Sequence, residues 1–236
     1  MNTQLLDQLV GLLVAEKPAR SRVFERWGID YCCGGKKALS EACAAKQLDA
    51  AAVMRDLETS DASPQPIVTD WSKEPLTALC DHIQKSHHGY LREALPRLTA
   101  LTEKVAERHG SRDKRLIELK NLYPTFRSNL EEHMAKEEDI LFPAIRSLEG
   151  RGPIDSLAYG IAEPIKVMLA DHDNAGAALD QLRELTDGYV ASPDACNTRR
   201  AMLDAFSELE TDMHQHVHKE NNILFPRALK MAAMRA

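Results

Sequence analysis

The chain has 236 residues, of which 5% are aromatic and 28% are charged, and it carries a formal net charge of −6. Its acidic and basic residues are interspersed, which excludes the basic footprint of a nucleic-acid-binding protein. No stretch approaches the roughly 18 apolar residues that span a membrane. We therefore expect no nucleic acid and no membrane among the partners.

The composition favours an all-α protein. Ala, Leu, Glu, Lys and Arg dominate, and runs of Val, Ile and Thr are absent. The five cysteines form no disulfide-like framework, which is typical of a reducing compartment. The N-terminus has no basic leader followed by an apolar core, so we expect no signal peptide and a cytoplasmic location.

Residues 1–60 predict a small helical domain. Apolar stripes and cap residues indicate four helices, which run from Gln4 (capped by Thr3) toward Glu16, over 20–27 up to Gly28, from Leu39, and over 49–58. A unit of this size has a thin hydrophobic core. We expect it to be mobile relative to the rest of the chain.

Two adjacent cysteines, Cys32 and Cys33, precede two glycines and two lysines in this domain. A helix N-terminus and neighbouring lysines lower the pKa of a thiol and favour the reactive thiolate. The alternative is that both thiols pack in a tight turn, and the residues alone leave both interpretations open. Cys43, Cys80 and Cys196 are isolated in helical contexts, where we expect small core residues.

Residues 61–70 predict a linker, and residues 71–236 predict a second domain. The linker holds two prolines and several small polar residues, and Trp71 is expected to anchor the domain that follows. Caps and prolines then indicate four long helices, which begin near Ser72, Ser111, Pro164 and Ser192 and end near His109, Leu148, Asp187 and Pro226. Short connections between them predict an up-down-up-down bundle, in which Pro124 should kink or break the second helix.

One eleven-residue phrase occurs twice in this second domain. Both copies read H-x-x-K-E-x-x-I-L-F-P, in residues 133–143 and 216–226. Residues four apart lie on the same face of a helix, so His133 lies over Glu137 and His216 over Glu220. A single pair of this kind is usually a solvated helix pair. The repetition of the polar letters, which a core repeat does not need, predicts a metal site instead.

The first and third helices must supply the remaining ligands. The third helix offers only His172, whereas the first offers His82, His87 and His88. His172 lies 44 residues before His216 and His88 lies 45 before His133, so a repeat of helix pairs ranks His88 first, His82 second and His87 third. We expect the unchosen histidines to be solvated at the surface, together with His109, His214 and His218, and His218 is alternatively an outer neighbour of the ligands.

Four imidazoles and two carboxylates suit iron, manganese or zinc. The set is too large for one tetrahedral zinc, but it can hold two metals if each carboxylate bridges. We therefore predict two non-heme, carboxylate-bridged iron ions per chain, with open positions for a small molecule. Only neutral imidazoles bind metal, so affinity is expected to weaken below about pH 6.5. Asp171 and Asp173 are expected to orient His172.

These motifs resemble the repair of iron centres family, whose members join a short N-terminal domain to a hemerythrin-like di-iron four-helix bundle. The resemblance covers nearly the whole chain and rests on Asp30-Tyr31-Cys32-Cys33-Gly34-Gly35, on the two repeated phrases, and on Asp171-His172-Asp-x-Ala-Gly between them. Carried over residue by residue, it implies metal ligands at His88, His133, Glu137, His172, His216 and Glu220, with the glutamates bridging. His87 departs from the tyrosine that often precedes the first ligand, and Pro124 is a second departure.

The resemblance also implies a function. Such proteins are stress-response factors that repair iron-sulfur clusters damaged by nitric oxide or oxidants, by donating iron to iron-sulfur client proteins. Cys32 and Cys33 are implicated in this activity, which favours the reactive interpretation of the pair. Two alternatives stay open: an enzyme that reduces nitric oxide or peroxide at the di-iron centre, and a sensor of a diatomic gas. Nitric oxide or an oxygen species is the expected small ligand in each case.

Overall fold

The computed structural model describes residues 5–63, 69–150 and 160–234, and its regular elements are helices, as predicted. This part of the chain contains no β-strand, only an isolated antiparallel bridge between Leu9 and Ala38. No described helix combines the length and the apolar character that a membrane crossing requires. The N-terminal unit consists of α1 (Val10–Glu16), α2 (Arg20–Trp27), α3 (Leu39–Ala45) and α4 (Ala50–Ala62).

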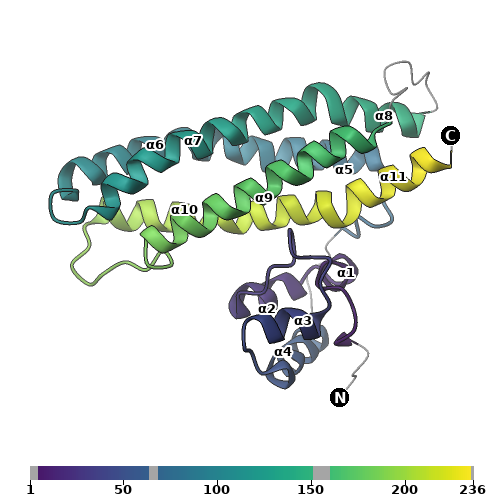
Figure 1. Ribbon diagram of the computed structural model, residues 1–236, viewed down its shortest axis with the longest axis horizontal. Coiled ribbons are helices and arrows are strands. Elements are labelled where there is room, and N and C mark those ends of the chain that lie inside the picture. Colours follow the sequence, from purple (N-terminus) through teal and green to yellow (C-terminus); the bar gives the residue numbers. More distant parts are fainter. Residues whose placement is uncertain (1–4, 64–68, 151–159, 235–236) are drawn as a thin grey trace.

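Four long helical rods form the rest of the molecule (Figure 1). They are α5 (Leu76–His82), η2 (Ile83–His88) and α6 (Gly89–His109); α7 (Arg115–Lys136), η3 (Glu137–Leu141) and α8 (Phe142–Gly150); α9 (Ala162–Leu185); and α10 (Asn197–Lys219), η4 (Glu220–Leu224) and α11 (Phe225–Ala233). Helix α6 packs on α7 and α10, and α7 packs on α9. The chain runs back and forth along the long axis, which confirms the four-helix bundle.

Three rods change from α-helix to π-helix near their middle. In the π-helical segments η2, η3 and η4 each backbone hydrogen bond reaches one residue further, which locally widens the helix. His88 ends η2, Glu137 begins η3 and Glu220 begins η4. Three predicted ligands therefore lie at widened turns, which are frequent at functional sites.

The apolar core of the bundle consists of two clusters. One contains Leu91 and Phe206, and the other contains Phe142 and Phe225. His88 and His172 fall between the residues of the two clusters along their rods, and the predicted ligands of the other two rods lie near the change from one cluster to the other. The N-terminal unit has a core cluster of its own, but its Cys32 packs into the first bundle cluster. The two units are thus in contact, and the predicted mobility of the N-terminal one stays a prediction.

The helix caps differ from those predicted at Ser72, Ser111 and Ser192. The first rod begins at Leu76, where the carboxylate of Glu149 accepts the backbone N–H groups of Leu76 and Thr77 at 2.7 and 2.8 Å. The second begins at Arg115, whose N–H donates to Asp113, and the fourth begins at Asn197. A cap that comes from another helix leaves no local pattern in the sequence. The predicted cap at Thr3 lies outside the described residues.

Pro124 does not break its helix, because α7 continues through it from Arg115 to Lys136. Helix α4 also extends two residues into the predicted linker, to Ala62. Its last turn is held by an ion pair between Asp61 and the buried Arg20, at 2.7 Å. The rest of the predicted linker includes residues 64–68, which lie outside the described part. The division into 1–60, 61–70 and 71–236 stays a prediction.

Trp71 anchors the start of the bundle. Its ring stacks on His82, with 4.4 Å between ring centroids and 25° between the planes. Its carbonyl accepts a hydrogen bond from Arg227 of α11 at 2.7 Å. The first and last rods are therefore joined at this point.

We predict that Trp71 fluorescence reports a late protonation of His82. Burial, assisted by the charge of Lys219, lowers the pKa of His82 to about 4, from an ordinary value of 6.5. Quenching of Trp71 by the charged ring should therefore be centred near pH 4. Because the folded state resists this proton, it also loses stability as the pH falls from 6.5 toward 4.

The control variant is His82→Gln, which removes the titrating ring and leaves Trp27 to report any general unfolding. A quenching midpoint near pH 6.5 in the unmodified protein would contradict this prediction.

Candidate metal centre

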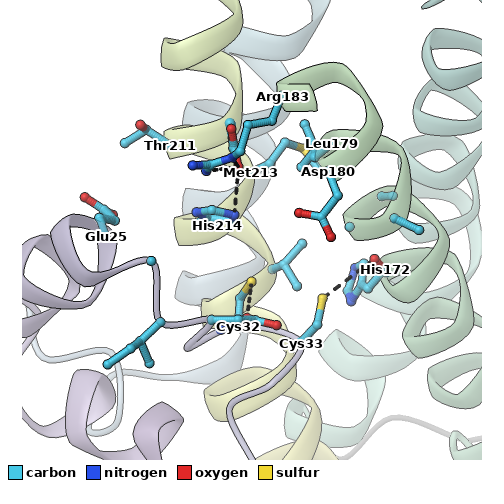
Figure 2. A pocket seen from close by; sticks show the side chains of 18 of the residues that line it. Glu25, Cys32, Cys33, His172, Leu179, Asp180, Arg183, Thr211, Met213 and His214 are labelled. Atoms are coloured by element: carbon cyan, nitrogen blue, oxygen red, sulfur yellow. Dashed lines mark hydrogen bonds and ion pairs between the residues drawn. The ribbon is translucent and has the colours of Figure 1, made fainter. Parts of the chain in front are cut away.

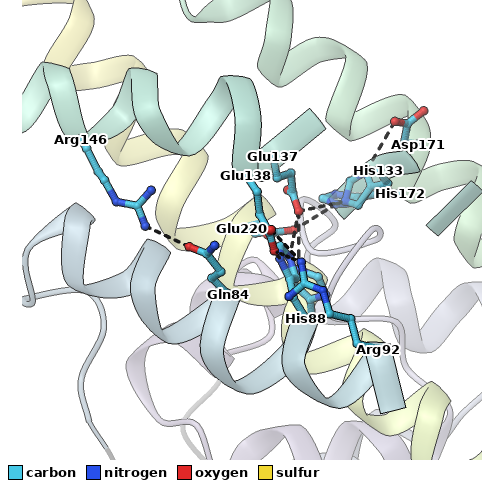
Figure 3. A network of polar contacts seen from close by, with 11 residues as sticks. Gln84, His88, Arg92, His133, Glu137, Glu138, Arg146, Asp171, His172 and Glu220 are labelled. Carbon is cyan, nitrogen blue, oxygen red and sulfur yellow. Dashed lines mark hydrogen bonds and ion pairs between the residues drawn. The ribbon is translucent and has the colours of Figure 1, made fainter. Parts of the chain in front are cut away.

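The structure brings the six predicted ligand residues together inside the bundle. They form two overlapping groups, in each of which the potential ligand atoms lie within 4.8 Å of one another: His88, His216, Glu137 and Glu220, and His133, His172, Glu137 and Glu220. All six residues are at most 3% exposed. Figure 3 shows the two glutamates between His88 on one side and the His133–His172 pair on the other. That these residues bind metal stays a prediction until tested.

Each glutamate reaches a histidine of both groups. Glu137 Oε2 lies 3.2 Å from His88 Nε2 and 3.4 Å from His133 Nε2. Glu220 Oε1 lies 3.0 Å from His216 Nε2, and its Oε2 lies 3.1 Å from His172 Nε2. This is the arrangement that two bridging carboxylates require. The helix spacing correctly placed His133 over Glu137 and His216 over Glu220.

Buried polar atoms without hydrogen-bond partners indicate that this set of side chains fits a cation. Within the described chain, His88 Nε2, both carboxylate oxygens of Glu137 and Glu220 Oε2 are fully buried and make no hydrogen bond. Such atoms cost free energy in an apolar interior unless something replaces water. Imidazole nitrogens and carboxylate oxygens together are ligands of iron, manganese and zinc. A pair of divalent cations would satisfy all of these atoms.

The two buried carboxylates of the site also favour a bound positive charge. Burial and the neighbouring charge of Glu220 raise the pKa of Glu137 well above its usual range. Without a cation, one proton is therefore retained at the carboxylate pair, and a bound cation would displace it. Burial also lowers the pKa of His133 to about 3, which keeps this ring neutral and able to bind metal. Burial opposes charge on His172 as well, but the Glu220 carboxylate at 3.1 Å and the hydrogen bond to Asn221 raise its pKa.

The residue after each repeated glutamate holds a histidine of another helix. Glu138 accepts a hydrogen bond from His88 Nδ1 at 2.7 Å, and Asn221 accepts one from His172 Nδ1 at 2.7 Å. Both oxygens of Glu138 also bind Arg92. These contacts fix which ring nitrogen faces the centre. The sequence reasoning missed both residues, although each follows its motif glutamate directly.

Two aspartates predicted to orient His172 do something else. Asp171 lies 3.5 Å from Nδ1 of His133 and 3.3 Å from the ammonium of Lys136. Asp173 lines a neighbouring pocket. The prediction was wrong because His172 takes its partner from η4, across the bundle, rather than from its own helix.

Of the three candidate histidines of the first rod, His82, His87 and His88, only His88 joins the ligand groups. His87 is buried rather than solvated, against expectation. Its ring accepts from Lys219 at Nε2 and contacts Asp212 at Nδ1, both at 2.7 Å. It also stacks on His216, with 5.2 Å between centroids and 5° between planes.

The remaining histidines and cysteines lie outside the ligand groups. His214 lies near Glu210, and His218 is buried at 3.4 Å from the Tyr31 carbonyl. Cys43 and Cys80 are buried, as predicted, but Cys196 is exposed and lies 3.3 Å from His109. The prediction failed for Cys196 because this residue precedes α10, outside the helical face on which it was placed.

The Cys32–Cys33 pair lies beside the ligand groups. Figure 2 shows the Cys33 sulfur pointing at the backbone of His172, whose carbonyl is 3.6 Å away. Cys32 is buried, with its sulfur 3.1 Å from Asp30. The hydrogen bond from Cys32 lowers the pKa of Cys33, whereas the pKa of Cys32 is raised. The burial of Cys32 fits the packing interpretation and the lowered pKa of Cys33 fits the reactive one, and the reactivity of the pair stays a prediction.

Two cavities reach the same half of the site. One, of about 670 Å³, is lined by both thiols and by His172. The other, of about 220 Å³, is lined by His133, His172 and Asp171. A small molecule or ion that used either cavity would meet the His133–His172 group.

Comparisons with known proteins show the family of this chain. The hemerythrin HHE cation binding domain model matches residues 79–228, so the chain belongs to this family. The ScdA_N domain of unknown function (DUF542) matches residues 6–61. Iron-sulfur cluster repair protein YtfE of Citrobacter koseri and that of Escherichia coli O8 are each 39% identical over 223 residues, which cover 94% of this chain and 97% of theirs. The predicted family resemblance is confirmed.

We predict that the two outer partners support metal binding unequally. Glu138→Ala removes a charged acceptor and should lower metal affinity about 100-fold, whereas Asn221→Ala removes a neutral one and should lower it about 10-fold. Competition with a chromogenic chelator measures both affinities. Glu208→Ala, at an exposed position of α10, is the control and should bind like the unmodified protein. Equal effects of the two substitutions would contradict this ranking.

Proposed function

We propose that this protein repairs iron-sulfur clusters damaged by nitric oxide or oxidative stress, in the cytoplasm, by donating iron from a di-iron centre to damaged client proteins. The observation that carries the proposal is the buried histidine–glutamate set with the Cys33 thiol beside it. Relatives that cover almost the whole chain are named iron-sulfur cluster repair proteins, which supports the same function.

Two iron ions fit the proposed ligand set. His88 and His216 would hold one, His133 and His172 the other, and Glu137 and Glu220 would bridge them. Bound iron supplies the material for repair and, as a redox-active ion, can bind nitric oxide or oxygen species. Apolar clusters flank the proposed ligand layer on both sides.

Glu137 gives the site a means of releasing its cargo. With both irons bound, its carboxylate is neutralised by metal charge. When an iron leaves, burial and the charge of Glu220 raise the pKa of Glu137, so that a proton takes the place of the cation. Release is thereby coupled to proton uptake at this carboxylate, and it is easier at lower pH.

The Cys33 thiol is positioned to meet iron on its way out. It lies against His172 and lines the larger cavity. A thiolate is a good ligand for iron in transit. We assign Cys32 and Cys33 to relaying iron or docking the iron-sulfur client.

A nitric oxide or peroxide reductase is the second candidate. The cavity of about 220 Å³ beside His133 and His172 favours it, because a diatomic molecule could reach the centre there. A donor loses iron to a chelator and re-metallates a client, whereas a reductase turns over with its iron retained. A gas sensor does neither, but changes conformation on binding.

We predict that the iron-loaded protein restores the activity of an iron-sulfur enzyme previously damaged with nitric oxide, while its own iron content falls. The Cys32→Ser/Cys33→Ser double variant should keep its iron and lose at least about tenfold in repair rate, because it lacks the thiol ligands. Cys196→Ser is the matched control, because it removes an exposed thiol that lies outside the ligand groups. Repair without loss of iron would contradict donation, and full repair by the double variant would contradict the relay.

A further inference from the structure

Asn222 joins the N-terminal unit to the segment that carries the metal site. It is the third residue of η4, after Glu220 in the ligand groups and Asn221 on His172. Its side-chain amide donates to the carbonyls of Tyr31 and Cys32, each at 3.2 Å. Three consecutive residues of one π-helical turn thus make three kinds of contact. Glu220 belongs to the ligand groups, Asn221 binds a ligand histidine, and Asn222 binds the loop of residues 31–35, which we call the cysteine loop.

Two glycines make room for this side chain. The N–H of Gly11 donates to the carbonyl of Gly35 at 2.9 Å, so α1 and the cysteine loop meet at this point. A Cβ atom at Gly11 would lie 2.2 Å from the Asn222 amide oxygen, and one at Gly35 would lie 2.4 Å from it. Any side chain at Gly11 would therefore push Asn222 out of its seat.

The other copy of the repeated phrase lacks this contact. Its equivalent residue is Asp139, which is exposed. A carboxylate at position 222 would have no N–H to donate and would face two carbonyl oxygens. The divergence between Asn222 and Asp139 therefore matches a place where the N-terminal unit contacts the second copy of the phrase.

The loop held by Asn222 is the one that carries the Cys33 thiol. Cys32 packs in the bundle core, and Cys33 lies 3.6 Å from the backbone of His172. His218, one turn before Asn222, adds a contact of 3.4 Å to the Tyr31 carbonyl. These contacts place the thiol close to a ligand residue only while the loop stays seated.

We propose that Asn222 is a positioning residue that seats the Cys32–Cys33 loop over the ligand groups and couples the loop to metal binding through η4. Glu220 and Asn221 contact the centre and its ligand His172, so a rearrangement of η4 on metal loss moves Asn222 with them. The exposure of Cys33 therefore reports the state of the centre. The inference does not require the protein to repair clusters.

The test is the alkylation rate of Cys33 by iodoacetamide, resolved by mass spectrometry of peptides, with exposed Cys196 as the internal reference. Asn222→Ala and Asn222→Asp in the iron-loaded protein should raise the Cys33 rate about tenfold, as expected for the loss of about 1.4 kcal/mol of seating contacts. Amide hydrogen exchange over residues 31–35 should rise in parallel. Asp139→Ala is the matched control and should leave both readouts unchanged.

Removing iron from the unmodified protein with a chelator should also speed Cys33 alkylation, and should add nothing in Asn222→Ala. Gly11→Ala tests the same contact from the N-terminal side without altering η4, and should likewise expose Cys33. Unchanged Cys33 alkylation and exchange in the Asn222 and Gly11 variants would overturn the positioning role. Equal rates with and without iron in the unmodified protein would overturn the coupling.

Discussion

The structure depends on the burial of two carboxylates among four imidazoles between two apolar clusters. Burial alone disfavours this layer, since Glu137 and Glu220 are fully enclosed and several of their oxygens make no hydrogen bond with the described residues. Bound cations would turn the cost into a gain, because these unpaired oxygens would become ligands. The π-helical turns at His88, Glu137 and Glu220 contribute to this arrangement, because they place the predicted ligands at widened points of the rods.

The two repeated phrases build a centre whose halves are alike in ligands and unlike in surroundings. On the His88 side, the outer acceptor is the charged Glu138, itself bound by Arg92. On the His172 side it is the neutral Asn221, and both cavities open there. The half in which His172 has a neutral outer acceptor is thus the half that faces the Cys33 thiol. This asymmetry suits a centre that keeps one position closed and exchanges ions or small molecules at the other.

Much of this site was predictable because helix periodicity converts sequence spacing into geometry. The four-residue spacing placed His133 with Glu137 and His216 with Glu220, and the all-α bundle followed from composition and breaks. Contacts between distant segments leave no such trace. Glu149 caps a helix 73 residues earlier in the chain, and Asn222 reaches carbonyls about 190 residues away. The buried His87 was misplaced for the same reason, because tertiary neighbours decide its environment, whereas Cys196 was misplaced because it precedes α10.

We propose that the ligand layer holds two irons. The direct test is to measure the metal content and visible spectrum of the freshly purified protein beside those of a Glu137→Ala/Glu220→Ala variant. We expect about two iron ions per chain and the absorption of a bridged di-iron centre. The variant should lose both and keep its helical content. Zinc alone, or a metal content that the two substitutions leave unchanged, would contradict it. In that case the repeated phrase would be a feature of helix packing, and the proposed function would fall with the site.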